Sequence, residues 1–543
     1  MSKKFFNKIE DILMMPFRKH FLFLISFFFL ATGPFFLWQF FYQHLPINGF
    51  FLTVHCFIIS YVVTLLVGLI KPDVVRKVVQ YILMAISAIS FAINFYCIFE
   101  LGYLLDADLA MLMLGTDLNE TREFASVMLP KWMIPTVLGI FLVFIALWRL
   151  SQRHNMNLGK KASWVAMAGL CLCIAINVRA WPVWEEGPIH RMYEMTQYEV
   201  TEDLTPYYTH PRITFIDDAQ LPSDVVLIIG ESFARCHSSL YGYDKETNPE
   251  LKALRDSAML FTFDSIDSPA PTTAESIRLM LSTYSQADDE SPSGDKKWFE
   301  YTTIIELMQD CGYDSYWFGN QARGSKKNGA TRVFAEACRQ QKFLQHEGAD
   351  RYNVTTDMVL VDSSLQYIRQ AKPGERHFII YHMMGSHFDY AMRYPQEFAH
   401  FSEKDYASQP QGHRATLASY DNSILYNDHV VSQIMNLYRD KDAVVIYVPD
   451  HGQVMYRNPQ RPDYFSHGNK KSALSYALGV EIPLFIYASP MYQERHPAIM
   501  ERIRSHASTP TTWNSDDLPY LIMDLIGARQ VGQEDIQSQS LLK

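Results

Sequence analysis

The sequence predicts two domains of different kinds: an α-helical membrane domain with five transmembrane helices, and an extracytoplasmic α/β domain with a largely parallel sheet. Long apolar segments fill the first third of the chain, whereas the remainder alternates short apolar runs with helical stretches and carries most of the charge. The mean hydropathy of −0.08 averages over these two parts. A chain of 543 residues also exceeds what one hydrophobic core usually supports.

The membrane domain is predicted from apolar segments within residues 1–180. Five of them are long and almost free of charge, at about 21–43, 48–70, 78–99, 132–150 and 163–179. About 20 such residues cross a bilayer as a helix. The first segment has no small-residue cleavage site and is longer than the apolar part of a signal peptide, so we expect a retained anchor. Buried helices of a large soluble core are the alternative.

Basic residues in the short loops predict the orientation. They gather at the N-terminus and in the loops after the second and fourth segments: Lys3, Lys4, Lys8, Arg18, Lys19, Lys71, Arg76, Lys77, Arg153, Lys160 and Lys161. If five helices alternate in direction, all of these residues lie on one side, and Lys and Arg favour the cytoplasm. We therefore expect a multi-pass protein with a cytoplasmic N-terminus and with everything after about residue 180 outside.

Three regions follow from this arrangement: a membrane domain at 1–180, a linker and membrane-interface segment at 181–223, and an outer domain at 224–543. An extracytoplasmic loop at about 100–131 belongs to the first region. Its apolar residues, among them Leu105, Leu109 and Met113, recur at helical spacing. This spacing favours an amphipathic helix on the outer membrane face, and a solvated connector is the alternative that the sequence leaves open.

The cysteine content and the net charge exclude few classes of function. The outer domain holds Cys236, Cys311 and Cys338, which allow at most one disulfide. An oxidising compartment permits such a bond without requiring it. The net charge of −10 argues against nucleic acid as a partner.

The outer domain is predicted from six continuous apolar runs separated by helical stretches. The runs lie at 224–230, 259–266, 313–320, 377–382, 443–449 and 483–488. Strands that are apolar on both faces and alternate with helices indicate an open, largely parallel sheet covered on both sides. Ligands of such sheets gather outside the carboxyl ends of the strands. Polar side chains that follow these runs are therefore the candidates for a site.

Acidic and imidazole side chains follow two of these strands. Glu231 comes directly after the run 224–230, and Asp450 and His451 come directly after the run 443–449. Carboxylate oxygen and imidazole nitrogen suit zinc or manganese. An Asp-His pair alone more often caps a turn, but a Glu, a hydroxyl and an Asp-His pair at successive strand ends together indicate a metal site.

The hydroxyl is Thr273, which lies where the helical stretch "AESIRLMLSTYS" begins. An unperturbed threonine is a poor nucleophile at neutral pH. Coordination to a divalent cation and a position at a helix N-terminus would both favour its alkoxide. A helix N-cap is the structural alternative, and both roles can hold together.

Several ordered motifs resemble those of the membrane phosphoethanolamine transferases, a family that includes lipid A modifying enzymes and the mobile colistin-resistance enzymes. The motifs are "GESFARCHSSLYGYDKETNPEL", "SPAPTTAESIRLMLS", "YHMMGSHFDYAMRYP", "VPDHGQ" and "SHG". The resemblance covers nearly the whole chain. It implies an alkaline-phosphatase-like, sulfatase-like outer domain in the periplasm, attached to the cell inner membrane, and a monomeric protein.

The resemblance also implies roles for individual residues. Glu231, Asp450 and His451 match zinc ligands, and Thr273 matches the nucleophile that also binds the metal. One Zn²⁺ is expected and a second is left open. Further positions match residues that contact the substrate: His387 and His467, which bind substrate phosphate or a second zinc, Lys326 with Lys327 as the alternative, and Thr116 and Glu120, which help to hold the head group.

Three departures from the family pattern leave the acceptor open. Gln453 stands where the family often has Glu, so any acid role there is lost. The lipid A enzymes are rich in disulfides of the outer domain, which three cysteines cannot reproduce. Leu112 stands where an asparagine is expected shortly before Thr116.

The expected reaction has two steps. Thr273 attacks the phosphorus of phosphatidylethanolamine and expels diacylglycerol, and an acceptor on lipid A, the lipopolysaccharide core or a periplasmic glycan then takes the phosphoethanolamine group from the threonine. His387 or His467 would protonate the leaving alkoxide. The alternatives are a lipoteichoic-acid-synthase-like glycerophosphate transferase that uses phosphatidylglycerol, a sulfatase, whose Cys/Ser-x-Pro-x-Arg pattern "TTAESIR" lacks, and a binding module without activity.

Overall fold

The computed structural model describes residues 3–38, 46–101, 104–105, 133–154, 157–179, 210–215, 221–290, 298–321, 330–345, 355–370, 372, 374–460, 462, 464–465, 467–468, 472–510, 512–531 and 539–543. Contacts divide the chain into two compact units, of which one comprises residues 1–114 and 127–200 and the other residues 115–126 and 201–543. Each unit has hydrophobic clusters of its own.

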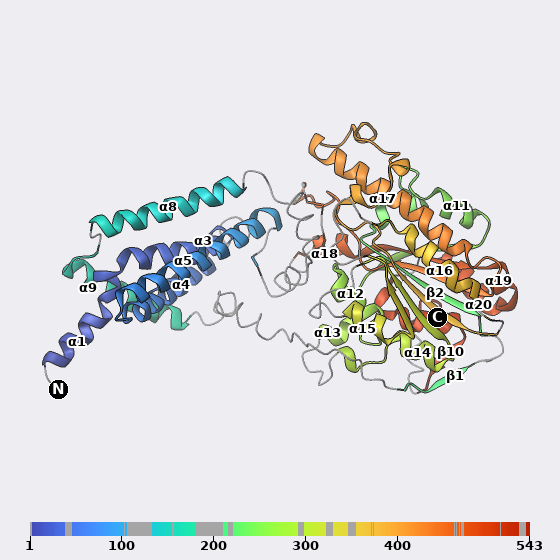
Figure 1. The fold of residues 1–543 in the computed structure, drawn as a ribbon, viewed down its shortest axis with the longest axis horizontal. Coiled ribbons are helices and arrows are strands. Elements are labelled where there is room, and N and C mark those ends of the chain that lie inside the picture. Colours follow the sequence, from blue (N-terminus) through green and yellow to red (C-terminus); the bar gives the residue numbers. More distant parts are fainter. Residues whose placement is uncertain are drawn as a thin grey trace. The chain divides into compact units, whose positions relative to one another are not determined.

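The first unit is helical. Its helices within the described residues are α1 (Lys3–Leu13), α2 (Met15–Lys19), α3 (Phe21–Trp38), α4 (Pro46–Gly68), α5 (Asp73–Tyr96), α8 (Met133–His154) and α9 (Lys160–Arg179) (Figure 1). Helix α3 packs against α4 and α5, and α9 packs against α4. Hydroxyl groups inside α4 bond to their own helix: Ser60 Oγ donates to the Cys56 carbonyl at 2.8 Å and Thr64 Oγ1 to the Ser60 carbonyl at 2.7 Å. These hydroxyl groups therefore have hydrogen-bond partners within the helix, as apolar surroundings require.

Helices occupy all five segments predicted to cross the membrane, but the count of five spans is not confirmed. Two helices, Phe50–Gly68 and Asp73–Phe99, are long and apolar enough to cross a membrane by length and composition. Phe21–Leu37 and Met133–Ala146 are shorter apolar helices. The loop predicted at 100–131 lies almost wholly outside the described residues.

The second unit is built on an eight-stranded sheet in the order β5-β4-β6-β2-β7-β8-β3-β9. The strands are β2 (Asp224–Gly230), β3 (Leu260–Asp267), β4 (Asp314–Gly319), β5 (Gln340–Phe343), β6 (His377–His382), β7 (Ala443–Pro449), β8 (Glu481–Ala488) and β9 (Trp513–Asn514). Strand β8 is antiparallel to both of its neighbours, β7 and β3, and the other pairings are parallel. The sheet is therefore mixed, but every strand except β8 runs in the same direction, so it is largely parallel, as the sequence predicted.

Helices cover both faces of this sheet (Figure 1). Alternate residues of β2 show the division, since Val225 and Leu227 pack in one cluster and Val226 and Ile228 in the other. The first face packs against α12 (Thr273–Met280), α14 (Ile304–Asp310), α15 (Ala330–Ala337), α19 (Pro490–Arg495), α20 (Pro497–Ala507) and α21 (Leu518–Leu525). The second face packs against α11 (Pro249–Asp256), α16 (Met358–Gln370) and α17 (Gln411–Asn436).

The remaining elements connect these layers. They are α13 (Gln286–Glu290), α18 (Ala473–Val480), and a separate two-stranded sheet of β1 (Ile213–Phe215) and β10 (Ala528–Gln530). Strand β1 lies within the segment 181–223 that the sequence assigns to a linker. The predicted domain boundaries at 180 and 223 stay a prediction. All seven cysteines lie in the described residues and are free thiols.

Candidate functional site

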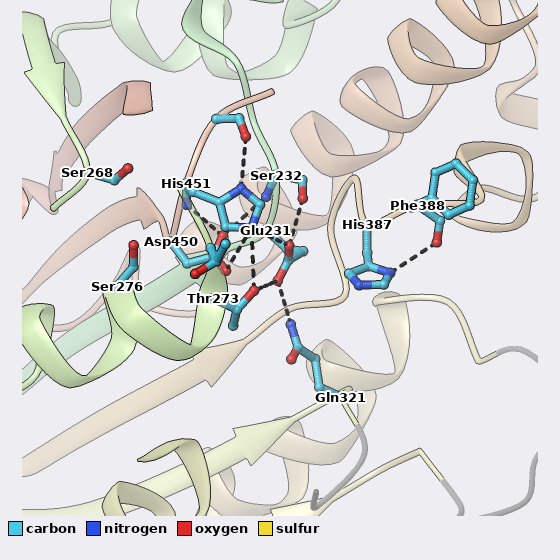
Figure 2. A network of polar contacts seen from close by, with 12 residues as sticks. Glu231, Ser232, Ser268, Thr273, Ser276, Gln321, His387, Phe388, Asp450 and His451 are labelled. Atoms are coloured by element: carbon cyan, nitrogen blue, oxygen red, sulfur yellow. Dashed lines mark hydrogen bonds and ion pairs between the residues drawn. The ribbon is translucent and has the colours of Figure 1, made fainter. Parts of the chain in front are cut away.

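The carboxyl ends of β2 and β7 bring together three side chains of the kinds that can hold a metal ion. The two strands are parallel neighbours, with Gly230 paired to Pro449, so Glu231 and Asp450 leave the sheet side by side. The side chains of Glu231, Asp450 and His451 are at most 1% exposed. One ligand atom from each lies within 4.8 Å of the others. Figure 2 shows these side chains and Thr273 pointing toward one another.

Ser232 fixes the chain as it leaves β2. Its φ of 56° is unusual for a residue other than glycine, and such strain persists where the surroundings hold it in place. Two bonds do so here, because the Ser232 amide donates to Asp450 Oδ1 at 3.2 Å and its hydroxyl donates to Glu231 Oε1 at 2.7 Å. The turn therefore ties the two carboxylates to each other.

One ring nitrogen of His451 faces the centre of the cluster. Its Nδ1 lies 2.8 Å from the carbonyl of Gly452, an arrangement in which Nδ1 carries the hydrogen and donates it. Its Nε2 lies 3.3 Å from Glu231 Oε1, 3.6 Å from Asp450 Oδ2 and 3.4 Å from Thr273 Oγ1. Three oxygens thus surround the ring nitrogen that faces the cluster.

Asp450 contributes a buried oxygen that no described residue satisfies. Its Oδ1 accepts the amides of Ser232 and His451, but its Oδ2 has no hydrogen-bond partner. A buried carboxylate oxygen without a partner is costly, and native structures rarely keep one without reason. A cation bound among these donors would satisfy it.

The charges of the three residues depend on one another. Burial raises the pKa of Glu231, but the hydrogen bond and charge of His451 outweigh burial and hold this pKa well below its usual value. Burial, together with the charge of Glu231, raises the pKa of Asp450 to about 8. Burial lowers the pKa of His451, but the Asp450 charge and the Glu231 bond outweigh it and raise this pKa to about 9. A metal ion that binds here therefore displaces protons.

Thr273 reaches the cluster from the first turn of α12. The preceding turn is held by two hydroxyls, since Ser268 and Ser276 both donate to the Ala270 carbonyl, at 2.8 and 2.7 Å. Thr273 Oγ1 donates to Glu231 Oε2 at 3.2 Å. The N-cap of α12 is Thr272, so Thr273 is free of that structural role.

Gln321 belongs to this site, and the sequence analysis missed it. Its amide Nε2 donates to Glu231 Oε2 at 3.0 Å and to the Met383 carbonyl at 2.9 Å (Figure 2). Gln321 follows β4, a strand of the same sheet, by two residues. Its position just after a strand makes it a candidate, but the sequence does not show which side chain of a loop turns toward the edge of the sheet.

His387 lies on the loop after β6, beside the cluster (Figure 2). Its Nδ1 lies 3.0 Å from the Phe388 carbonyl. The start of the loop is held by the buried Asp357, which accepts the amides of Met384 and Gly385 at 2.9 and 2.8 Å. Asp357 thus fixes the backbone at the start of the loop that carries His387.

His467 lies against the same cluster from another loop. Its ring is 4.7 Å from the ring of His451, edge to face, and burial and the charge of His451 lower its pKa. The structure therefore brings Glu231, Thr273, Asp450, His451 and His467 together. Four residues predicted or considered for the substrate lie outside the described residues: Thr116, Glu120, Lys326 and Lys327.

The comparisons with known proteins agree with this geometry. Residues 223–528, more than half of the chain, match the Sulfatase family. The chain belongs to the sulfatase family.

Curated relatives of this sulfatase-family chain include phosphoethanolamine transferases. Phosphoethanolamine transferase EptC of Escherichia coli O18:K1:H7 is 28% identical over 294 residues, which are 53% of this chain and 49% of that protein. The Kdo(2)-lipid A phosphoethanolamine 7''-transferase of Escherichia coli K12 is 28% identical over 271 residues, 50% of this chain and 45% of that protein. The chain thus spans about half the length of the curated relatives it matches. These relatives confirm the resemblance that the motifs predicted.

Solved structures share the fold. Lipooligosaccharide phosphoethanolamine transferase A of Neisseria meningitidis, an integral membrane protein, superimposes with a TM-score of 0.63 at 17% identity, over 97% of this chain and 96% of that one. The C-terminal periplasmic domain of EptC from Escherichia coli, in complex with Zn, gives a TM-score of 0.53 at 22% identity, over 61% of this chain and 89% of that one. Both units therefore have counterparts in one known membrane protein.

Proposed function

We propose that this protein transfers phosphoethanolamine from phosphatidylethanolamine to an acceptor of the cell envelope through a phosphothreonine intermediate at Thr273, with zinc as its cofactor. The observation that carries the proposal is the position of Thr273 Oγ1, 3.2 Å from Glu231 Oε2 and 3.4 Å from His451 Nε2. The names of the relatives support phosphoethanolamine as the transferred group and lipid A as one acceptor class.

Four side chains place their donor atoms close together. Thr273 Oγ1 lies 3.2 Å from Glu231 Oε2 and 3.4 Å from His451 Nε2. His451 Nε2 also lies 3.3 Å from Glu231 Oε1 and 3.6 Å from Asp450 Oδ2. The donor set of two carboxylates, an imidazole and a hydroxyl also suits zinc. The zinc held by the related EptC domain supports this choice.

In the first step, the Thr273 oxygen attacks the phosphorus of the donor lipid. The Oγ–P bond forms as the P–O bond to diacylglycerol breaks, and the hydroxyl proton leaves toward Glu231 Oε2, to which it already donates. A bound zinc ion would lower the pKa of the Thr273 hydroxyl and would neutralise charge on the phosphoryl oxygens. The first turn of α12 favours the same negative charge.

The histidines are assigned to proton transfer and to the phosphoryl group. His387 or His467 gives a proton to the diacylglycerol oxygen as it leaves, which typically contributes about 10² to 10⁴ in rate. In the second step an acceptor oxygen attacks the same phosphorus, and the Oγ–P bond breaks. Lys326, Thr116 and Glu120 are proposed to hold the substrate.

The membrane helices fit a donor that stays in the bilayer. The acyl chains of phosphatidylethanolamine remain in the leaflet, so an anchored enzyme meets its head group at the membrane surface. We place the N-terminus in the cytoplasm and the catalytic unit in the periplasm at the inner membrane, because the basic residues lie in alternate loops. We propose a monomer.

The decisive experiment uses full-length protein in cells and in vesicles. Thr273→Ala should abolish the phosphoethanolamine mass on envelope lipids and glycans, whereas Thr273→Ser should retain part of it. Vesicles with labelled phosphatidylethanolamine should give a labelled protein that Thr273→Ala lacks. Labelling from phosphatidylglycerol instead would favour a glycerophosphate transferase, and unchanged modification by Thr273→Ala would refute the proposal.

A further inference from the structure

Helix α17 approaches the metal cluster through one buried tyrosine. Tyr420 is fully buried, and its hydroxyl donates to the Ser232 carbonyl at 2.7 Å. The same hydroxyl accepts the amide of Ala234 at 2.9 Å. Both bonds are to the chain directly after Glu231. One phenolic oxygen therefore fixes the strained turn whose Ser232 amide and hydroxyl hold the two carboxylates of the cluster.

A second buried tyrosine packs against the first. The rings of Tyr390 and Tyr420 are 4.9 Å apart, edge to face at 70°. Tyr390 lies three residues after His387, and its hydroxyl donates to the Phe465 carbonyl at 3.3 Å. Phe465 precedes His467 by two residues, and the carbonyl of His467 accepts the hydroxyl of Tyr464 at 2.7 Å. Tyr390 thus joins the loops that carry the two site histidines.

A neighbouring contact strengthens this arrangement. Ser423, one helical turn after Tyr420 in α17, donates its hydroxyl to Ser386 Oγ at 2.9 Å. The Ser386 amide in turn donates to the Glu231 carbonyl at 3.0 Å. The loop that carries His387 therefore bonds both to α17 and to Glu231. The loops after β2 and after β6 therefore both contact one short stretch of α17, and Phe465 bonds to the loop after β6 through Tyr390.

We propose that Tyr420 and Tyr390 are positioning residues with separate tasks: Tyr420 sets the metal ligand Glu231, and Tyr390 sets His387 and His467 relative to each other. This inference rests on the proposed function for Glu231 as a zinc ligand and for the roles of the histidines. Phenylalanine would fill the same apolar space, so packing alone does not account for two hydroxyls that both bond to active-site backbone. Neither tyrosine touches the reacting atoms.

The test compares three full-length variants that each remove one buried hydroxyl. Tyr420→Phe and Tyr390→Phe alter the proposed pair. Tyr438→Phe is the matched control, because Tyr438 is also fully buried and, among the described residues, its hydroxyl bonds to that of Tyr381 at 2.9 Å. Zinc affinity is measured by competition with a chelator, thermal unfolding by calorimetry, and turnover in phosphatidylethanolamine vesicles.

Tyr420→Phe should weaken zinc affinity about 10- to 100-fold, the usual effect of losing a residue that orients a metal ligand. Tyr390→Phe should leave zinc affinity within about threefold of the wild type and lower kcat about tenfold, because it disturbs the histidines alone. Tyr438→Phe should change neither the zinc affinity nor kcat. Equal zinc affinity in Tyr420→Phe and Tyr438→Phe would overturn the proposal, as would an equal loss of kcat in all three.

These outcomes are distinguishable from a failure of the proposed function. If the donor or the acceptor is not the one proposed, the zinc affinities of Tyr420→Phe and Tyr438→Phe still differ. If Tyr420→Phe does not accumulate, Tyr390→Phe still decides the second half of the inference, since a merely structural role would change stability without lowering kcat at unchanged zinc affinity.

Discussion

His382 is a buried side chain whose polar atoms find no partner. It is the last residue of β6 and is fully buried, and neither ring nitrogen has a hydrogen-bond partner among the described residues. Its ring lies edge to face with that of Trp317, at 5.5 Å. Buried polar atoms are usually hydrogen-bonded, so the two ring nitrogens of His382 are an exception. Burial lowers the pKa of His382 to about 4.

This shift predicts a loss of stability in acid. The folded state keeps His382 neutral while the unfolded chain protonates it below about pH 6.5, so unfolding takes up a proton between about pH 6.5 and 4 and stability falls across that window. A shift of that size corresponds to about 3 kcal/mol at its lower end. His382→Leu should flatten this part of the profile, measured by chemical unfolding at a series of pH values. Parallel profiles for wild type and variant would contradict the prediction.

Side chains at the site differ in how far the sequence reveals them. Glu231, Asp450 and His451 were predicted because they directly follow apolar runs whose ends meet at one edge. Gln321 was not, because which side chain of a loop turns toward the edge depends on backbone angles that no periodicity encodes. The φ of 56° at Ser232 is such an angle. Strand ends are thus readable from sequence, and loop conformations are not.

At the scale of elements, the loop after β6 depends on a glycine. Gly385 has a φ of 49°, and a Cβ added there would lie 2.9 Å from the Glu231 nitrogen and 3.0 Å from the Glu231 carbonyl oxygen. Side chains strongly disfavour both this φ and such a short contact with backbone. The motif "MMGSH" therefore needs glycine, because the loop after β6 lies close to the backbone of Glu231 after β2.

Gly385→Ala should push Glu231 out of place. We expect zinc affinity to fall about 10- to 100-fold, since the change moves the support of a ligand, and stability to fall by about 1–3 kcal/mol. Gly374→Ala is the control, because Gly374 also has a positive φ, of 88°, but nothing lies within 4 Å of an added Cβ. Chelator competition and thermal unfolding check both variants. An equal effect of the two substitutions on zinc affinity would show that strain, and not the contact with Glu231, matters.

Most strands of the large sheet and their common direction could be predicted, but the reversed direction of β8 could not. The runs 224–230, 377–382 and 443–449 match β2, β6 and β7 at both ends. Strand β8 is nearly as buried and apolar as β7, and composition does not reveal that it runs antiparallel to it. The short strands β5 and β9 were not predicted, because a segment of two to four residues shows no detectable hydrophobic period.

At the scale of the whole molecule, the two units differ in what zinc can do to them. The donors Glu231, Thr273, Asp450 and His451 all belong to the second unit, and the first unit has hydrophobic clusters of its own. A ligand that binds only the folded form of one unit stabilises that unit, by about 2.7 kcal/mol at a concentration 100 times its Kd. Zinc should therefore act on one part of the chain.

Hydrogen exchange of the full chain in detergent, with and without zinc, resolves this by peptide. Added zinc should slow exchange in peptides from β2, β7 and α12, whose folded state it binds, and leave those from α4 and α5 unchanged, because these helices contribute no donor. Asp450→Asn should remove the difference, since it replaces a carboxylate ligand with an amide of the same shape. Protection that spread equally into α4 and α5 would mean that the units unfold as one. Protection that persisted in Asp450→Asn would place the zinc elsewhere.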